Sequence, residues 1–344
     1  MPIRLLTTLI ILATVVLVLL LGPLLVPIAE LETVPAAQLA TPTSQFIDVD
    51  GYTLHYDQRE PIGVGRDVTV TYVFLHGFIG NTFAWRHVLD DLTQVSDDVG
   101  DTRDAADIKM SALAYDRLGF GLSARPVRGD WPRGDNPYTF EAQQLRLLTL
   151  LDVLEPSGNI ILVGHDTGAA LALALAERAP ERFAGIILIA PIPEVTSNVR
   201  GLWRLLIRTP QVDRLGPLFM RQLAGGPGQE MLRLSLPEPD AISPDVIAGY
   251  RQNVEVDNWD RALWELSRAT TSATSPTRTP KEMPVLVIAS RDDQLVPIAR
   301  SQELARDLAA PLVNLAACGH LPQEACLQEL TQTMTDWVAE AVLD

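Results

Sequence analysis

Short apolar runs alternate along this chain with stretches of helical periodicity. Six runs are β-prone, and three of them are followed directly by a histidine, a carboxylate or a glycine. The six runs span 68–75, 110–115, 159–163, 184–190, 285–289 and 311–315. Helical spacing of apolar residues fills 82–95 and 139–154, between successive runs. Strands that alternate with helices pair in parallel through right-handed crossovers. The pattern therefore predicts an α/β fold with a mostly parallel sheet.

Two parts of the chain depart from this alternation. Residues 46–50 and 52–56 are β-prone and joined through Gly51, which predicts a hairpin at the start of the domain. Between Pro191 and Pro284 the pattern is helical, rich in Pro and Arg, and without a clear strand. We expect a helical cap there, inserted into the sheet domain at about 192–283. The acidic stretch 96–107 is expected to be a solvated loop.

The N-terminus carries a long uncharged apolar segment. No charged residue occurs from Leu5 to Ile28, and a helix of that length reaches about 36 Å, enough to cross a bilayer. A cleaved signal peptide is the alternative, but the apolar run is long and no A-x-A site follows it. We therefore expect a membrane anchor at 1–30, a Pro-, Ala- and Thr-rich linker at 31–44 and a catalytic domain at 45–344.

Flanking charges predict the orientation of this anchor. Arg4 precedes the apolar segment, whereas Glu30 and Glu32 follow it. By the positive-inside rule the N-terminus stays in the cytoplasm. The sequence thus predicts a single-pass membrane protein with an extracytoplasmic catalytic domain.

Composition excludes several classes of partner. The chain has 344 residues and a formal net charge of −16, which argues against nucleic acid and against electrostatic binding to anionic lipid. No HExxH, CxxC or Cys/His cluster occurs, so we expect neither a metal nor a cofactor. The two cysteines, Cys318 and Cys326, make no disulfide framework. They can pair or simply pack, and we expect packing.

The most informative motif is Gly164-His165-Asp166-Thr167-Gly168. It follows the apolar run 159–163 and precedes the Ala- and Leu-rich helical stretch 169–178. Strand, sharp turn and helix match the G-x-S-x-G nucleophile elbow, but a carboxylate replaces the serine hydroxyl. A carboxylate that attacks carbon leaves an ester on the enzyme, so this one residue changes the reaction class.

Three further pieces accompany the elbow, each after a predicted strand: His76-Gly77-Phe78, Asp292-Asp293 and Gly319-His320. Nucleophile, acid and histidine in this order are typical of the α/β-hydrolase fold. Over roughly 45–344 the chain resembles the α/β-hydrolase superfamily, and its aspartate elbow resembles epoxide hydrolases and haloalkane or haloacid dehalogenases. The resemblance implies an eight-stranded, mostly parallel sheet with helices on both faces and a helical cap.

The motif positions suggest a catalytic role for each residue. We expect Asp166 to be the nucleophile and His320 to take a proton from the water that cleaves the ester. The other four histidines have structural explanations: His55 in a strand, His76 in the oxyanion loop, His87 on a helix surface and His165 behind the elbow.

The family pattern places the acid four residues before Pro297, which selects Asp293 rather than Asp292 to orient the histidine. Glu194, after the sixth strand of the sheet, is the alternative. The backbone N–H groups of Phe78 and Thr167 are expected to form the oxyanion hole. Arg117, in the loop after the run 110–115, is expected to be structural.

Several residues that mark specific activities are missing. Epoxide hydrolases usually have two cap tyrosines, whereas the expected cap holds only Tyr250, which we expect to pack. Haloalkane dehalogenases commonly have Trp after the nucleophile and Asn after the His-Gly pair; this chain has Thr167 and Phe78. The cap tryptophans Trp203, Trp259 and Trp264 are expected to pack, with pocket lining as the alternative. Substrate identity is open, but a small apolar electrophile such as an epoxide or a halide fits this branch.

Two other functions remain compatible with the sequence. In an esterase-like or lyase-like enzyme, Asp166 acts as a base or binds substrate. In a non-catalytic protein, the hydrolase scaffold only binds a ligand, because function depends on the site and not on the fold.

Overall fold

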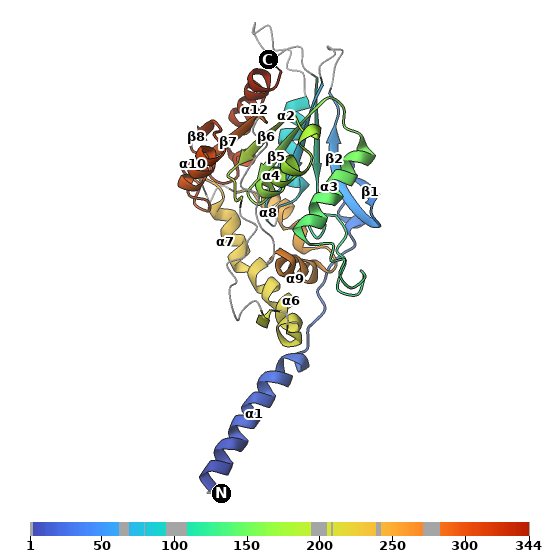
Figure 1. Ribbon diagram of the computed structural model, residues 1–344, viewed down its shortest axis with the longest axis vertical. Coiled ribbons are helices and arrows are strands. Elements are labelled where there is room, and N and C mark those ends of the chain that lie inside the picture. The colour runs from blue at the N-terminus through green and yellow to red at the C-terminus, as the bar shows by residue number, and fades with distance from the viewer. Residues whose placement is uncertain are drawn as a thin grey trace.

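An eight-stranded sheet forms the centre of the molecule in the computed structural model (Figure 1), which describes residues 3–61, 69–78, 80–93, 109–193, 205–207, 209–238, 242–270 and 283–343. The strand order is β1-β2-β4-β3-β5-β6-β7-β8. Their bounds are Gln45–Val49, Tyr52–Arg59, Thr69–Leu75, Lys109–Tyr115, Asn159–His165, Gly185–Ile189, Val285–Ser290 and Leu312–Leu315 for β1 to β8. All six apolar runs and the hairpin therefore form strands.

Strand direction follows the predicted pattern. β1 pairs antiparallel with β2, and β2 antiparallel with β4, while every other pair is parallel. In the centre of the sheet Leu75 of β3 lies opposite Tyr115 of β4 and Gly164 of β5. The three strands thus end at the same edge, and the loops that follow them meet there.

Helices cover both faces of the sheet. α3 (Phe140–Leu154), α4 (Gly168–Arg178) and α10 (Ile298–Asp307) share one apolar core with the sheet, and α2 (Arg86–Thr93) and α12 (Leu327–Ala341) share the other. Along β3, Val73 and Leu75 face the first core, whereas Tyr72 and Phe74 face the second. Burial on both faces explains why the strands are continuous apolar runs.

The inserted segment between β6 and β7 is helical where it is described. Its helices are α6 (Pro210–Ala224), α7 (Gly226–Leu234), α8 (Pro244–Arg251) and α9 (Trp259–Thr270). α6 packs closely on α9 at Gly216, where a Cβ atom would lie 2.1 Å from the ring of Trp264. The absence of a side chain at Gly216 permits this close approach. Trp259 and Trp264 are buried in this packing, as expected. Trp203, Glu194 and the stretch 96–107 lie outside the described residues.

Short helices complete the element list. They are η1 (Ala36–Gln38), η2 (Thr82–Trp85), η4 (Pro180–Arg182), η6 (Gln252–Val254) and α11 (Pro322–Ala325). The predicted helix at 82–95 thus begins with the 3₁₀ turn η2 and continues as α2.

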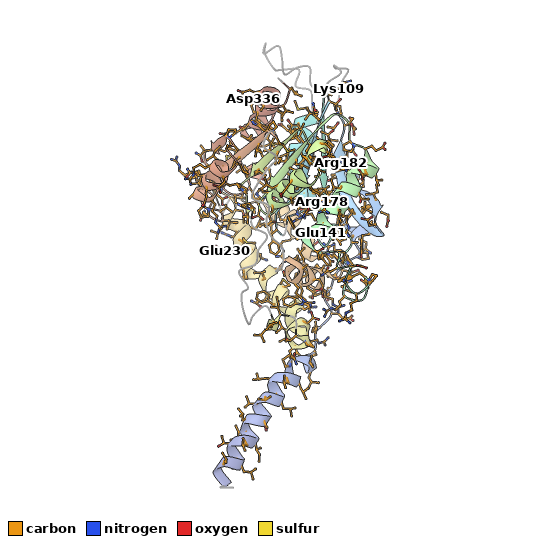
Figure 2. All side chains as sticks on the ribbon, viewed as in Figure 1. Lys109, Glu141, Arg178, Arg182, Glu230 and Asp336 are labelled. Carbon is orange, nitrogen blue, oxygen red and sulfur yellow. A yellow bond between two sulfur atoms is a disulfide. The ribbon has the colours of Figure 1, made fainter. Side chains whose placement is uncertain are left out.

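The N-terminal helix α1 (Ile3–Leu25) projects away from the domain beside α6 (Figure 1). Its segment Leu5–Leu25 has a mean hydropathy of 2.8, and none of it is buried (Figure 2). Among the described residues it is the helix that is long and apolar enough to cross a membrane, although a signal sequence meets the same criterion. The following segment contacts the cap, since Val34 donates to the carbonyl of Glu255 at 2.9 Å.

Candidate active site

Asp166 occupies a sharp turn between β5 and α4. Its φ is +51°, in the left-handed region that a residue with a side chain rarely adopts. Three backbone hydrogen bonds hold this conformation: Asp166 donates to the carbonyl of Ile189 at 3.1 Å, and its own carbonyl accepts from Ala169 at 3.2 Å and from Ile192 at 3.0 Å. This strained backbone directs the carboxylate of Asp166 toward the cavity, as the elbow motif predicts.

The flanking glycines allow the backbones around the turn to approach each other. A Cβ atom on Gly168 would lie 2.2 Å from the carbonyl oxygen of Leu75, and one on Gly164 would lie 2.7 Å from the Cα of Ala169. On the neighbouring loop, a Cβ atom on Gly77 would lie 2.6 Å from Oδ2 of Asp166. Glycine is therefore required at these positions for steric reasons.

The loop after β3 brings a backbone donor to the carboxylate. Phe78 N–H donates to Oδ2 of Asp166 at 2.8 Å. His76 holds this loop: its Nδ1 bonds the carbonyl of Gly77 at 2.8 Å, and its Nε2 accepts from the N–H of Arg117 at 3.0 Å. Burial and the nearby Arg117 charge lower the pKa of His76 to about 3, so the ring is neutral and acts as a structural element.

His320 and Asp293 form the expected pair. Nδ1 of His320 lies 2.9 Å from Oδ2 of Asp293. Burial alone lowers the pKa of His320, but the hydrogen bond and charge of Asp293, together with the charge of Asp166, outweigh it and raise the pKa. Oδ1 of Asp293 accepts from the N–H groups of Leu295 and Val296 at 2.8 and 2.9 Å. Burial raises the pKa of Asp293, but His320 and these two N–H groups together leave it below its ordinary value.

The neighbouring carboxylate points elsewhere. Oδ2 of Asp292 accepts from the N–H of Ala317 at 3.0 Å, and its side chain is exposed. The structure therefore places Asp293, and not Asp292, against the histidine.

Two contacts position the backbone of His320. Its N–H donates to the carbonyl of Ser235 in the cap at 2.8 Å, and its carbonyl accepts from Nε2 of His165 at 2.9 Å. The His165 ring lies 4.8 Å from the His320 ring between centroids. Burial and the adjacent His320 lower the pKa of His165 to about 4, so it stays neutral beside the catalytic candidate.

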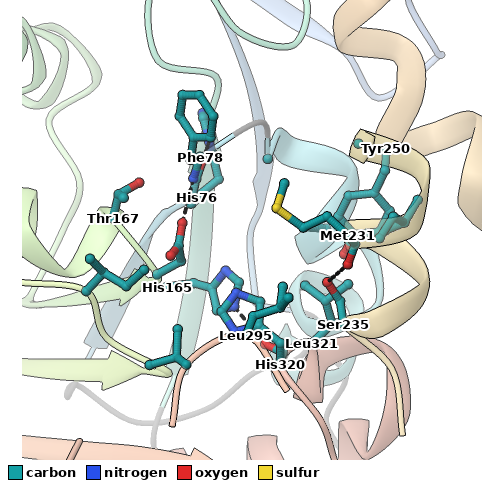
Figure 3. A pocket seen from close by; sticks show the side chains of 18 of the residues that line it. His76, Phe78, His165, Thr167, Met231, Ser235, Tyr250, Leu295, His320 and Leu321 are labelled. Carbon is teal, nitrogen blue, oxygen red and sulfur yellow. Dashed lines mark hydrogen bonds between the residues drawn. The ribbon is translucent and has the colours of Figure 1, made fainter. Parts of the chain in front are cut away.

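Asp166 and His320 line one cavity of about 430 Å³ between sheet and cap (Figure 3). Phe78 and Thr167 line the same cavity, and Thr167 is the N-cap residue of α4. Apolar side chains supply much of the rest of the wall: Ala84, Ile192, Ala224, Met231, Leu232, Val254, Leu295, Val296 and Leu321. The cavity thus brings together four of the five residues expected to act in catalysis, and the fifth, Asp293, is bonded to His320 without lining the cavity.

Comparisons with known proteins identify the family of this chain. The model of the alpha/beta hydrolase family matches residues 72–333. The chain belongs to this family. It is 27% identical over 248 residues to a 2-hydroxymuconate semialdehyde hydrolase of Pseudomonas putida. That alignment covers 67% of this chain and 77% of the other protein. A haloalkane dehalogenase of Mesorhizobium japonicum is 23% identical over 300 residues, with 79% of this chain and 85% of that protein covered.

Solved structures show the same fold. A thermophilic esterase from Thermogutta terrifontis superposes with a TM-score of 0.60 at 19% identity, covering 87% of this chain and 99% of that one. The meta-cleavage product hydrolase CumD also gives a TM-score of 0.60 at 19% identity, with 87% and 99% covered. The protein is a hydrolase of the α/β-hydrolase family.

Tyr250 of this hydrolase was expected only to pack, but it lines the cavity. Its hydroxyl donates to Oε1 of Glu324 at 3.1 Å, and Glu324 is held by both terminal nitrogens of Arg86 at 2.6 and 2.9 Å. Burial and the charge of Glu324 raise the pKa of Tyr250 well above its ordinary value. Tyr250 and Glu324 are 74 positions apart, so no local sequence signal links them.

The expectation that the two cysteines only pack is wrong. Cys318 and Cys326, eight positions apart in sequence, form a disulfide in the hydrolase, with their Cα atoms 5.7 Å apart. The closed loop contains His320, Gln323 and Glu324, so the disulfide restrains the segment that carries the candidate base. Glu329 lies near both sulfurs, but they are bonded to each other and do not offer metal ligands.

Arg117 is structural, as expected. It is buried, and its guanidinium donates to the carbonyl of Gly77 at 3.1 Å and stacks on Phe120 at 4.9 Å. Burial lowers the pKa of Arg117, and the nearby charge of Asp166 partly offsets this effect. The arginine braces the Phe78 loop from behind the cavity.

Proposed function

We propose that Asp166 is the nucleophile of this hydrolase and attacks an electrophilic carbon of an epoxide, a halide or a related small molecule. The observation that carries the proposal is a carboxylate at a strained elbow, in the same cavity as a histidine paired to a second carboxylate. Attack by one carboxylate oxygen breaks the bond to the leaving group and forms an alkyl ester on Asp166.

His320 then acts in the second step. Its Nδ1 faces Asp293, so Nε2 is the nitrogen that remains to accept a proton from water. The resulting hydroxide attacks the ester carbonyl, and the oxyanion is stabilised by the N–H of Phe78 and, we propose, that of Thr167. Collapse of the intermediate releases the alcohol, and the proton on His320 returns to it.

Cavity chemistry supports a small apolar substrate. Most of the surface that lines the cavity is apolar, although Gln229, Ser235, Tyr250 and Arg251 of the cap also line it (Figure 3). The Tyr250 hydroxyl is directed at Glu324 and not at Asp166, so it offers no evident proton to an epoxide oxygen. Halides leave without a proton, which makes an alkyl halide the better fit of the two classes.

Trapping the ester tests the nucleophile. His320→Gln should form the ester but not hydrolyse it, and mass spectrometry should find the substrate fragment on the peptide that contains Asp166. His320→Gln combined with Asp166→Asn is the matched control and should show no adduct. If epoxides and halides leave no adduct on His320→Gln while the native hydrolase turns them over, Asp166 is not the nucleophile.

We also propose that α1 remains as a single-pass anchor with the catalytic domain outside the cytoplasm. Arg4, which precedes the apolar segment Leu5–Leu25, and Glu30, which follows it, support this orientation. The Cys318–Cys326 disulfide supports it independently, because disulfides persist mainly in oxidising compartments. The intact mass of the hydrolase extracted from membranes tests retention of residues 1–30, and protease accessibility on spheroplasts tests the side.

A further inference from the structure

The cap of this hydrolase is bonded directly to the N-terminal helix. Gln211, in the first turn of α6, donates through its carboxamide to the carbonyl of Leu20 in α1 at 3.1 Å. Further along α6, Arg214 donates to the carbonyl of Val26 at 3.3 Å, and Arg221 to the carbonyl of Ala29 at 2.7 Å. α6 therefore runs beside the end of α1, as Figure 1 also shows.

These contacts fix the height of α6 relative to the apolar segment. Leu20 lies five residues before Leu25, where the candidate span ends. At 1.5 Å per residue, the Gln211 contact is about 7 Å below that end. Arg214 and Arg221 instead contact carbonyls beyond it, where long basic side chains near the end of a span can reach the lipid headgroups. If α1 crosses a bilayer, the first turn of α6 lies within its interface.

Exposed apolar side chains occur on α6 and in the residues that precede it. Leu205, just before α6, is 65% exposed, and Phe219 on α6 is 60% exposed. We call Leu205, the first turn of α6 and Phe219 the platform. Side chains of this kind are unfavourable in water and favourable in the headgroup region of a bilayer.

The platform is continuous with the wall of the active-site cavity. Ala224, at the end of α6, lines the cavity, and so do Gly228, Met231 and Leu232 of α7. Helix α6 therefore begins beside Leu20 of α1 and ends at the wall of the cavity.

We propose that the platform rests in the bilayer that holds α1, so that its partner is the lipid surface itself and substrates that partition into lipid enter the cavity from that side. The inference depends on the proposed anchor but not on the chemistry of Asp166. The hydrolase carries a formal charge of −16, so contact with lipid is apolar and does not need anionic headgroups.

A depth measurement in neutral lipid tests this docking. The full chain is reconstituted into phosphatidylcholine nanodiscs with an environment-sensitive fluorophore on Leu205→Cys or Phe219→Cys. Leu145→Cys is the matched control, because Leu145 is also an exposed leucine, 45% accessible, but lies on α3 of the sheet domain. The unsubstituted chain should not label, since its two cysteines form a disulfide.

We expect a blue shift at positions 205 and 219, with loss of emission when the lipids carry doxyl groups, and neither effect at position 145. If the fluorophores at positions 205 and 219 emit at the same wavelength as the one at position 145, the proposed docking on the bilayer is wrong. This conclusion does not depend on the result of the ester-trapping experiment. For lipid entry, Leu205→Glu should lower turnover of a lipid-partitioned substrate and spare a water-soluble substrate with the same reactive group. If Leu205→Glu and the unsubstituted hydrolase turn over the lipid-partitioned substrate equally fast, substrates do not enter from the lipid side.

Discussion

The N–H of Phe78 donates to Oδ2 of Asp166 at 2.8 Å, although the two residues lie 88 positions apart. In the mechanism we propose, this bond leaves Oδ1 as the oxygen that attacks the substrate. Once Oδ1 carries the alkyl group, Oδ2 would be the carbonyl oxygen of the ester and would already face its donor. The same N–H would then stabilise the oxyanion without rearrangement.

Oxygen exchange provides the first prediction. In a single turnover in H₂¹⁸O, the alcohol should carry unlabelled oxygen from Asp166, and the Asp166 peptide should gain the heavy isotope. The reason is that water attacks the carboxyl carbon and not the substrate. Heavy oxygen in the first-turnover alcohol, with none in the peptide, would show direct attack by water.

The pH dependence of ester hydrolysis provides the second. His320 must be neutral to accept a proton, and its pKa is raised. Hydrolysis should therefore fall as the pH drops, with its midpoint at the pKa of His320. In the alkyl ester Asp166 carries no charge, so Asp293 is the carboxylate that holds this pKa up. Asp293→Asn removes the charge that raises the pKa, so it should move the midpoint down and slow the step; rapid-quench rates across pH measure both.

Asp292→Asn is the control for that experiment. Asp292 bonds the N–H of Ala317 and not His320. It should leave the midpoint in place, and a shift equal to that of Asp293→Asn would contradict the assigned pair.

Tyr250→Phe should have a small effect on turnover. Its hydroxyl is bonded to Glu324, and its raised pKa makes it a weak acid. We expect kcat to fall less than about tenfold, whereas loss of a general acid costs about 10²–10⁴. Steady-state kinetics on an epoxide and a halide would decide the matter, and a large loss confined to the epoxide would assign proton donation to Tyr250.

Reduction of the disulfide should weaken both fold and activity. The bond closes a loop of eight positions in sequence, for which chain entropy gives about 2–3 kcal/mol of stabilisation. Since His320 lies within that loop, Cys318→Ser with Cys326→Ser should lower the denaturation midpoint and kcat. Reductant should do the same to the native protein and nothing further to the double variant; unchanged kcat after verified reduction would show that the bond does not position His320.

A glycine pair tests the geometry of the elbow. Gly168→Ala brings a Cβ atom to 2.2 Å from the carbonyl oxygen of Leu75, and overpacking of this kind costs about 1–3 kcal/mol. Gly226, the first residue of α7, has open space where its Cβ atom would be, so Gly226→Ala should change stability by less than about 0.5 kcal/mol. Urea unfolding compares the two, and equal stabilities would contradict the close contact at the elbow.

Sequence patterns alone predicted the sheet and its direction. Apolar runs buried on both faces identify parallel strands regardless of their neighbours, as β3 and β5 illustrate. The same reasoning drew attention to Asp166, the Asp292-Asp293 pair and His320, because catalytic loops follow strand ends. The choice of Asp293 over Asp292 came from the resemblance to the α/β-hydrolase family. Their roles in catalysis stay predictions until the ester is trapped.

Tertiary structure alone decided the contacts between distant segments. Neither the Cys318–Cys326 bond nor the Tyr250–Glu324 hydrogen bond has a periodic signature, since each depends on how loops and cap helices fold over the sheet edge. The position of α6 along the axis of α1 likewise follows from three hydrogen bonds, and no sequence pattern predicts them. Hydrophobic periodicity reports which face of an element is buried, whereas pairing across a cavity depends on the relative positions of whole elements.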